Sequence, residues 1–149
     1  MLRVRELMTR DVLTLAPDTT VRHAVEQFSI AKVGASPVCQ RGRVVGMLSA
    51  RDLLDFIAAL PGEPSEVSGG ADHGILENHT VEEAMTLAPL HSIAPDAPAS
   101  RAAELMQAEG IHHLPVIEGE LLVGIVSTLD LVKAVAQRKF THRTQLFPR

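Results

Sequence analysis

The alternation of apolar and polar residues predicts one series of elements, written twice along the chain. In the first copy, Val21, Val25 and Phe28 follow helical spacing, and Asp18 or Thr20 precedes them as a candidate N-cap. A short strand, a turn, a nearly continuous apolar strand and a last helix follow, over 36–40, 41–43, 44–49 and roughly 50–60. The second copy predicts a helix from about 98 to 109, strands over 114–118 and 121–127, and a helix over 128–139.

The two copies align residue for residue. Ala16-Pro17-Asp18 falls on Ala94-Pro95-Asp96 at a shift of 78 residues, and the same shift aligns the later V-G pairs and S-x-x-D motifs. Upstream, VRELMT (4–9) matches VEEAMT (81–86) at a shift of 77. Repeats of this length are typical of units that bury their apolar faces against each other. Each copy therefore predicts a β-α-β-β-α unit of an α/β fold, after a short leading helix and an extended segment.

The repeats set the expected domain boundaries. Residues 1–60 form the first repeat and residues 80–140 the second. Residues 61–79 are rich in proline, glycine, serine and acids, which indicates a flexible linker or surface loop. Residues 141–149 belong to a basic tail that either frays or docks on a partner.

Composition limits the classes of binding partner and the cellular compartment that we expect for this chain. A formal net charge of −4, with no tryptophan and no tyrosine, argues against nucleic acid as a partner. No apolar run approaches the roughly 20 residues of a membrane span, and the N-terminal stretch lacks the apolar core of a secretory signal. Cys39 has no second cysteine with which to pair. We therefore expect a cytoplasmic protein that binds neither nucleic acid nor membrane.

Each copy carries an S-x-x-D motif directly after its apolar strand, at 49–52 and 127–130. Such a motif can be a capping box, in which serine and aspartate simply close the helix N-terminus. A helix N-terminus also offers free amides to an anion, and a carboxylate beside it suits the paired hydroxyls of a ribose. The recurrence of the motif favours a nucleotide site, and Arg51 adds a bidentate phosphate donor to the first copy.

The order, spacing and duplication of these motifs resemble the tandem CBS-domain pair, or Bateman module, over nearly the whole chain apart from linker and tail. The resemblance implies two CBS repeats packed through their sheets with pseudo-twofold symmetry. It implies two clefts between the repeats that bind AMP, ADP, ATP or sometimes S-adenosylmethionine, as a regulatory ligand and not as a cofactor. It also implies a homodimer formed through helices. A stand-alone sensor of this kind would act on an effector protein that the sequence does not identify.

The resemblance assigns two sets of ligand-binding residues. Each set joins the S-x-x-D motif of one repeat to the extended segment and the proline strand of the other, the proline strands being the short strands over 36–40 and 114–118. The Asp52 set comprises Met47, Ser49, Arg51, Asp52, Leu90, His91, His112, His113 and Pro115. The Asp130 set comprises Ile125, Ser127, Asp130, Thr9, Val12, Leu13, Ala35, Ser36 and Pro37. The aspartates would bind ribose hydroxyls and the serines ribose or phosphate. The backbone around 90–91 or 12–13 would read the adenine edge.

The two sets differ in charge. The Asp52 set holds Arg51 and three histidines, whereas the Asp130 set has almost no cationic side chain. We therefore predict that the Asp52 set prefers phosphorylated nucleotides, and that the Asp130 set binds more weakly, stays empty or takes a less charged ligand. Because imidazole titrates near pH 6.5, phosphate affinity at His112 and His113 is expected to rise in mild acid.

Three other interpretations compete with a nucleotide sensor. His91, His112 and His113 could bind zinc or nickel, although neighbours on a strand point to opposite faces and chelate one ion poorly. An enzyme is disfavoured, and no catalytic residue is assigned, because neither aspartate has a nucleophile nearby in sequence and no phosphate-loop motif is present. A ligand-free structural or oligomerisation module fits the same fold.

Overall fold

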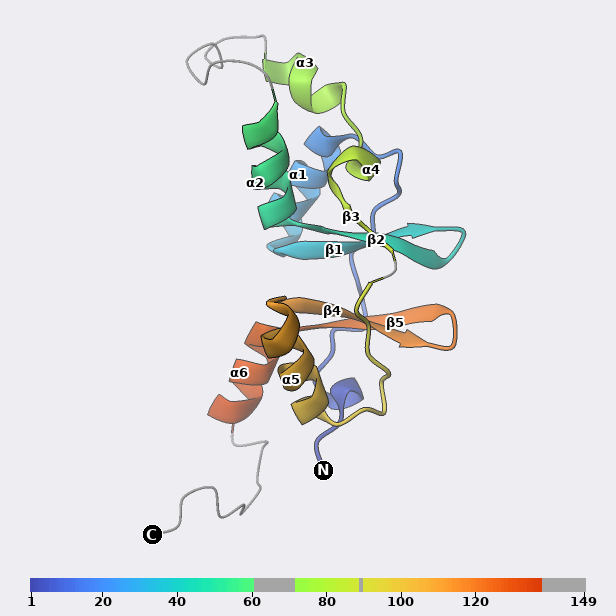
Figure 1. Ribbon diagram of the computed structural model, residues 1–149, viewed down its shortest axis with the longest axis vertical. Helices are drawn as coiled ribbons and strands as arrows, with labels where there is room; N and C mark the ends of the chain where they lie inside the picture. The colour runs from blue at the N-terminus through green and yellow to red at the C-terminus, as the bar shows by residue number, and fades with distance from the viewer. Residues whose placement is uncertain (61–71, 89, 138–149) are drawn as a thin grey trace. The chain divides into compact units, whose positions relative to one another are not determined.

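The computed structural model describes residues 1–60, 72–88 and 90–137, which fall into two compact units (Figure 1). The β1 unit holds Val12–Leu90 together with Glu120–Leu122. The β4 unit holds Met1–Asp11, His91–Gly119 and the chain from Val123 on. The leading segment of each repeat, 1–11 or 80–90, thus belongs to the unit built around the other repeat. The boundaries 1–60 and 80–140 describe the sequence repeats and stay a prediction.

The β1 unit contains the elements expected for the first repeat. They are α1 (Val21–Ala31), β1 (Ala35–Gln40), β2 (Arg43–Ser49) and α2 (Ala50–Ala59), followed by α3 (Asp72–Glu77), α4 (Val81–Ala84) and β3 (Thr86–Leu87). The strands form an antiparallel sheet in the order β1-β2-β3, and Leu15 adds a parallel bridge to Val38. Helix α3 differs from the flexible linker expected there, because Leu76 packs on the core and Glu77 pairs with Arg22 at 3.1 Å. Residues 61–71 of that linker lie outside the described residues.

The β4 unit repeats the arrangement. Its elements are η1 (Val4–Glu6), α5 (Ala99–Glu109), β4 (His113–Glu118), β5 (Leu121–Ser127) and α6 (Thr128–Ala136). Strands β4 and β5 pair, and Ile93 adds a parallel bridge to Val116. The first strand of each β-α-β-β-α unit is therefore a single bridge, and the predicted α/β repeat fold is confirmed. The basic tail and the end of the last predicted helix, 138–139, lie outside the described residues.

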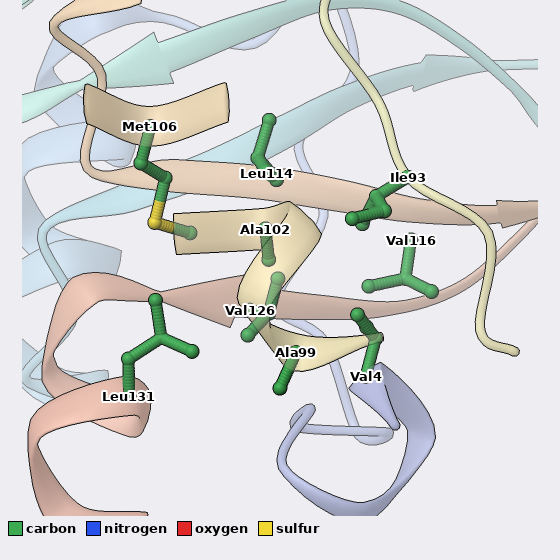
Figure 2. Close-up of a cluster of buried hydrophobic side chains, with 9 residues drawn as sticks. All are labelled: Val4, Ile93, Ala99, Ala102, Met106, Leu114, Val116, Val126 and Leu131. Carbon is green, nitrogen blue, oxygen red and sulfur yellow. The ribbon is translucent and has the colours of Figure 1, made fainter. Parts of the chain in front are cut away.

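Each unit has its own hydrophobic core. In the β4 unit the core is the cluster drawn in Figure 2: Val4, Ile93, Ala99, Ala102, Met106, Leu114, Val116, Val126 and Leu131. The β1 unit buries Leu15, Val21, Ala24, Phe28, Val38, Leu48, Leu53 and Val81. Val25 was expected on the buried face of α1 but is 37% exposed, because the stripe runs through Ala24 instead. In the described residues, no helix is both long and apolar enough to span a bilayer.

A buried valine fixes each leading segment to its unit. Val4 and Val81 are both completely buried, and full burial of a valine side chain contributes about 1.5–3 kcal/mol. The backbone adds directional contacts, since the Val4 amide donates to the Ala97 carbonyl and the Val81 amide to the Thr19 carbonyl, at 2.9 and 2.8 Å. Val4 and Val81, the first residues of the repeated stretches VRELMT and VEEAMT, therefore anchor each leading segment through both apolar and hydrogen-bonding contacts.

A glycine on β2 or β5 lets the leading segment of each unit approach closely. In the β4 unit, a Cβ at Gly124 would lie 2.6 Å from Met8 Sδ and 2.9 Å from the Thr9 carbonyl oxygen. In the β1 unit, a Cβ at Gly46 would lie 2.6 Å from Met85 Sδ. Real Cβ atoms do not approach other atoms so closely, so both positions require glycine. The repeated M-T and V-G pairs are thus two sides of one packing contact.

Lys32 ends α1 in the left-handed region, with a φ of 54°, where the second repeat ends α5 with Gly110 at a φ of 64°. A side chain with a Cβ is strained there, so Lys32→Gly is expected to stabilise the fold by about 1 kcal/mol. Thermal unfolding checks this, and the reciprocal Gly110→Lys variant should lower the midpoint. An unchanged or lower midpoint for Lys32→Gly would contradict the expected strain.

Candidate ligand-binding site

Ser49 and Asp52 close the N-terminus of α2 as a capping box. The Asp52 amide donates to Ser49 Oγ at 3.0 Å, and the Ser49 amide donates to Asp52 Oδ2 at 2.8 Å. Ser127 and Asp130 make the same two hydrogen bonds on α6, at 3.2 and 2.8 Å. The capping interpretation of the S-x-x-D motifs is confirmed. Their role in ligand binding stays a prediction.

The cap leaves polar atoms of each motif available. All four capping residues are partly buried. Within the described residues, Oδ1 of Asp52 and Oδ1 of Asp130 have no hydrogen-bond partner. Each serine hydroxyl accepts a backbone amide and still carries a hydrogen that it can donate. A carboxylate oxygen and a hydroxyl donor therefore stand together at each strand-to-helix junction.

The loop before each proline strand is tied to the neighbouring junction in the same unit. The Ala50 amide, first in α2, donates to the Gly34 carbonyl at 2.8 Å. The Thr128 amide, first in α6, donates to the His112 carbonyl at 2.9 Å. In each unit, a backbone hydrogen bond consequently joins the loop before the proline strand to the start of the last helix.

Arg51, predicted as a phosphate donor, is engaged with its own helix. Its Nε donates to Asp55 Oδ1 at 3.1 Å, and the two side chains are 79% and 65% exposed. An exposed pair at this spacing contributes little to stability, about 0.3–0.5 kcal/mol. A ligand phosphate could therefore displace Asp55 at small cost. At the equivalent place in α6, Leu129 offers no such donor.

His112 and His113 lie in the β4 unit beside the start of α6. The Thr128 hydroxyl donates to the His112 carbonyl at 3.2 Å and lies 3.4 Å from Nδ1 of the His112 ring. Burial lowers the pKa of the His113 ring below its usual 6.5, the neighbouring His112 lowers it further, and Asp130 opposes both. The two histidines thus come together with Asp130, while their predicted grouping with Asp52 stays a prediction. Sequence reasoning missed Thr128, whose signal was its place directly after Ser127.

The extended segments contact β5 and the end of α5. Thr9 exchanges two backbone hydrogen bonds with Ile125, at 2.9 and 3.0 Å. His91 Nε2 lies 3.2 Å from Oε2 of Glu109, an ion pair that exists when His91 is protonated. Glu109, at the end of α5, was not predicted. The remaining predicted residues of these segments are partly buried, namely Val12, Leu13 and Leu90.

The predicted residues on the strands lie mostly inside their units. Ala35, Ser36 and Pro37 are buried at the start of β1, and Pro115 is buried on β4. Met47, opposite Pro37 in the sheet, is partly buried, as is Ile125 on β5. Ser36 Oγ donates to the Leu13 carbonyl at 2.6 Å. The hydroxyl of Ser36 is therefore used within the β1 unit.

A metal site in the described residues would need several ligand side chains gathered around one point. Among them, no group of three or more His, Cys, Asp or Glu side chains is placed to hold a metal ion. Cys39 is partly buried, and burial raises the pKa of its thiol above the ordinary value. A histidine-based metal site gains no geometric support from these residues.

The two sequence repeats match a known domain family. The sequence model of the CBS domain matches twice, over residues 4–59 and 81–137. The chain belongs to the CBS domain family. The CBS domain-containing protein YhcV of Bacillus subtilis is 32% identical over 128 residues, covering 86% of this chain and 81% of YhcV.

Two further comparisons place this CBS pair among longer and shorter relatives. The A-adding tRNA nucleotidyltransferase of Aquifex aeolicus is 28% identical over 137 residues, which are 91% of this chain and 15% of that enzyme. The chain therefore spans a small part of that enzyme's length. The crystal structure of CBSX2 in complex with AMP is similar with a TM-score of 0.75 and 25% identity, over 93% of this chain and 99% of CBSX2.

Proposed function

We propose that this CBS pair is a regulatory module that binds an adenine nucleotide and signals to a partner protein by a conformational change. The observation that carries the proposal is the pair of S-x-x-D junctions, each with a carboxylate oxygen and a hydroxyl donor left over from the cap. These groups, beside a helix N-terminus, suit a ribose and a phosphate. The AMP bound to CBSX2 supports the choice of an adenine nucleotide. Action in the cytoplasm, which an unpaired cysteine suits, is part of the proposal.

The proposed roles follow from the groups that the caps leave available. Oδ1 of Asp52 or Asp130 accepts hydrogen bonds from ribose hydroxyls, and the capping serine donates to ribose or phosphate. The Asp52 set takes the more phosphorylated nucleotide because Arg51 can exchange Asp55 for a phosphate. The Asp130 set takes a less charged ligand or binds more weakly.

We propose that two copies associate through the final helices. Leu54 and Ile57 on α2 are 61% and 44% exposed, and the repeat-equivalent Val132 and Val135 on α6 are 60% and 63% exposed. Exposed apolar stripes of this kind mark association surfaces. Sedimentation equilibrium should therefore give a dimer, and Val132→Glu should shift it toward monomer. A monomeric wild type, or a variant as dimeric as the wild type, would contradict this surface.

His113 provides a pH prediction with a defined sign. Because the pKa of His113 is lowered in the folded chain, the unfolded chain binds its proton more readily, and stability is lost as pH falls below about 6.5. Because of the lowered pKa, His113 becomes positively charged only at a more acidic pH. The gain in phosphate affinity that it provides is therefore also expected at a more acidic pH. His113→Gln should flatten both trends between pH 7 and about pH 5. Thermal midpoints and AMP titrations across this range check the result, and unchanged trends in the variant would contradict the role of His113.

Thermal unfolding with AMP, ADP, ATP and S-adenosylmethionine tests the proposed function. A ligand present at 100 times its Kd adds about 2.7 kcal/mol to the stability of the folded chain. A midpoint that rises with at least one of these ligands supports the nucleotide sensor. No rise with any of them would contradict it and favour the ligand-free structural module.

A further inference from the structure

Ser36 is a polar residue inside the core of the β1 unit. It has no solvent exposure. Its hydroxyl donates to the Leu13 carbonyl at 2.6 Å, with a second, longer contact to the Pro37 carbonyl at 3.2 Å. A carbonyl left without its partner in such a place costs about 1–3 kcal/mol. The hydroxyl therefore fixes the backbone of Leu13 firmly.

The backbone of the extended segment is anchored a second time, two residues further on. The Leu15 amide donates to the Pro37 carbonyl at 3.0 Å, and the Leu15 carbonyl accepts from the Cys39 amide at 2.8 Å. In the described chain, the Leu13 amide has no hydrogen-bond partner. The segment thus presents an available donor, the Leu13 amide, directly before a backbone stretch that its own unit holds at the Leu13 carbonyl and at Leu15.

The second repeat keeps the backbone anchor and lacks the hydroxyl. The Ile93 amide donates to the Pro115 carbonyl at 3.1 Å, as Leu15 does to Pro37. Leu114 stands where the first repeat has Ser36, and it is equally buried. A leucine has no hydrogen to donate to the carbonyl of His91. The two extended segments are therefore unequal, because the Leu13 carbonyl receives a serine hydroxyl that the second repeat does not supply.

We infer that Ser36 is a positioning residue for adenine recognition. It holds the backbone at 12–13 in place so that this backbone can hydrogen-bond the edge of the base, without itself contacting the ligand. The inference rests on the proposed function and changes the predicted role of Ser36 from ligand contact to support. Fixing a recognition segment before binding removes its ordering cost from the binding free energy.

Comparison of AMP with ribose 5-phosphate separates positioning from a general loss of structure. Both probes carry the sugar and the phosphate, and AMP alone carries the base. In Ser36→Ala, AMP affinity at the weaker class of sites should fall about tenfold, with little change for ribose 5-phosphate. Ser29→Ala, an exposed serine on α1, is the matched control and should change neither. Equal losses for both probes, or unchanged AMP affinity, would overturn the inference.

Amide hydrogen exchange of the wild type tests the same inference without a variant. The amides of Leu15 and Ile93 make equivalent hydrogen bonds, so the Ser36 anchor should make the Leu15 amide exchange about tenfold more slowly. Equal or faster exchange at Leu15 would overturn the inference even if Ser36→Ala does not fold. If the wild type binds none of AMP, ADP, ATP and S-adenosylmethionine, the proposed function and this inference fail together. If it binds AMP and Ser36→Ala keeps the wild-type preference for AMP over ribose 5-phosphate, the inference alone fails.

Discussion

Asp52→Ala is expected to weaken AMP and ATP binding by about 10- to 100-fold, since hydrogen bonds to a charged carboxylate contribute about 1.5–3 kcal/mol. The variant loses the Oδ1 acceptor proposed for the ribose hydroxyls. It also loses the Oδ2 acceptor that receives the Ser49 amide at 2.8 Å. Stability should therefore fall by about 1 kcal/mol as well, the typical effect of a lost cap. Isothermal titration gives the affinity, and thermal unfolding gives the stability.

Asp130→Ala is the matched control for the lost cap. Its carboxylate receives the Ser127 amide at the same 2.8 Å, so the effect on stability should be similar. The effect on phosphorylated nucleotides should be smaller, because Leu129 replaces Arg51 in the second motif. Unchanged nucleotide affinity in Asp52→Ala would contradict the site assignment. Equal losses in the two variants would contradict the predicted difference between the sets.

Gly46→Ala and Gly124→Ala should each destabilise the fold by about 1–3 kcal/mol through overpacking. The added methyl would lie 2.6 Å from a methionine Sδ in both cases. The methionine could move, but the carbonyl oxygens of Thr86 and Thr9, at 2.8 and 2.9 Å, belong to the backbone. The strand and the leading segment must separate to make room. Urea unfolding measures the loss of stability.

Gly74→Ala is the control for adding a methyl group to a glycine. Gly74 lies in α3, where a Cβ would be 3.7 Å from Asn78 Nδ2, an ordinary contact. Alanine in a helix is favoured over glycine by about 0.5–1 kcal/mol, so this variant should be neutral or stabilised. If Gly46→Ala and Gly124→Ala behave like Gly74→Ala, the close approach of the leading segments is not a determinant of stability.

The elements could be predicted from sequence because their signals are local. Thr20 accepts the His23 amide at 3.1 Å as an N-cap, and Gly110 ends α5 in the left-handed region, as their residue types indicated. That each leading segment belongs to the unit built around the other repeat could not be predicted in this way. It depends on Val4 and Val81 entering cores that are distant in sequence, and periodicity carries no information about such partners. Helix α3 was missed because the segment 61–79 is rich in proline, glycine, serine and acids, a composition typical of linkers.

In the candidate site, too, the local features could be predicted from the sequence and the long-range contacts could not. The S-x-x-D caps follow from a spacing of three residues, and both were found where they were predicted. The hydrogen bonds of Thr128 with His112 and of Ser36 with Leu13 join residues 16 and 23 positions apart. Contacts of that range depend on tertiary packing, so the sequence offered the residues without their partners. For Arg51 the residue type predicted a phosphate donor, which stays a prediction, and the pairing of its Nε with Asp55 was not predicted.

The central claim is that this CBS pair binds an adenine nucleotide through its S-x-x-D junctions. Isothermal titration of AMP into the purified wild-type chain tests the claim most directly. The account predicts saturable binding that competes with ATP and is weakened in Asp52→Ala. Titrations with AMP and ATP that show no saturable binding at millimolar concentration would contradict it.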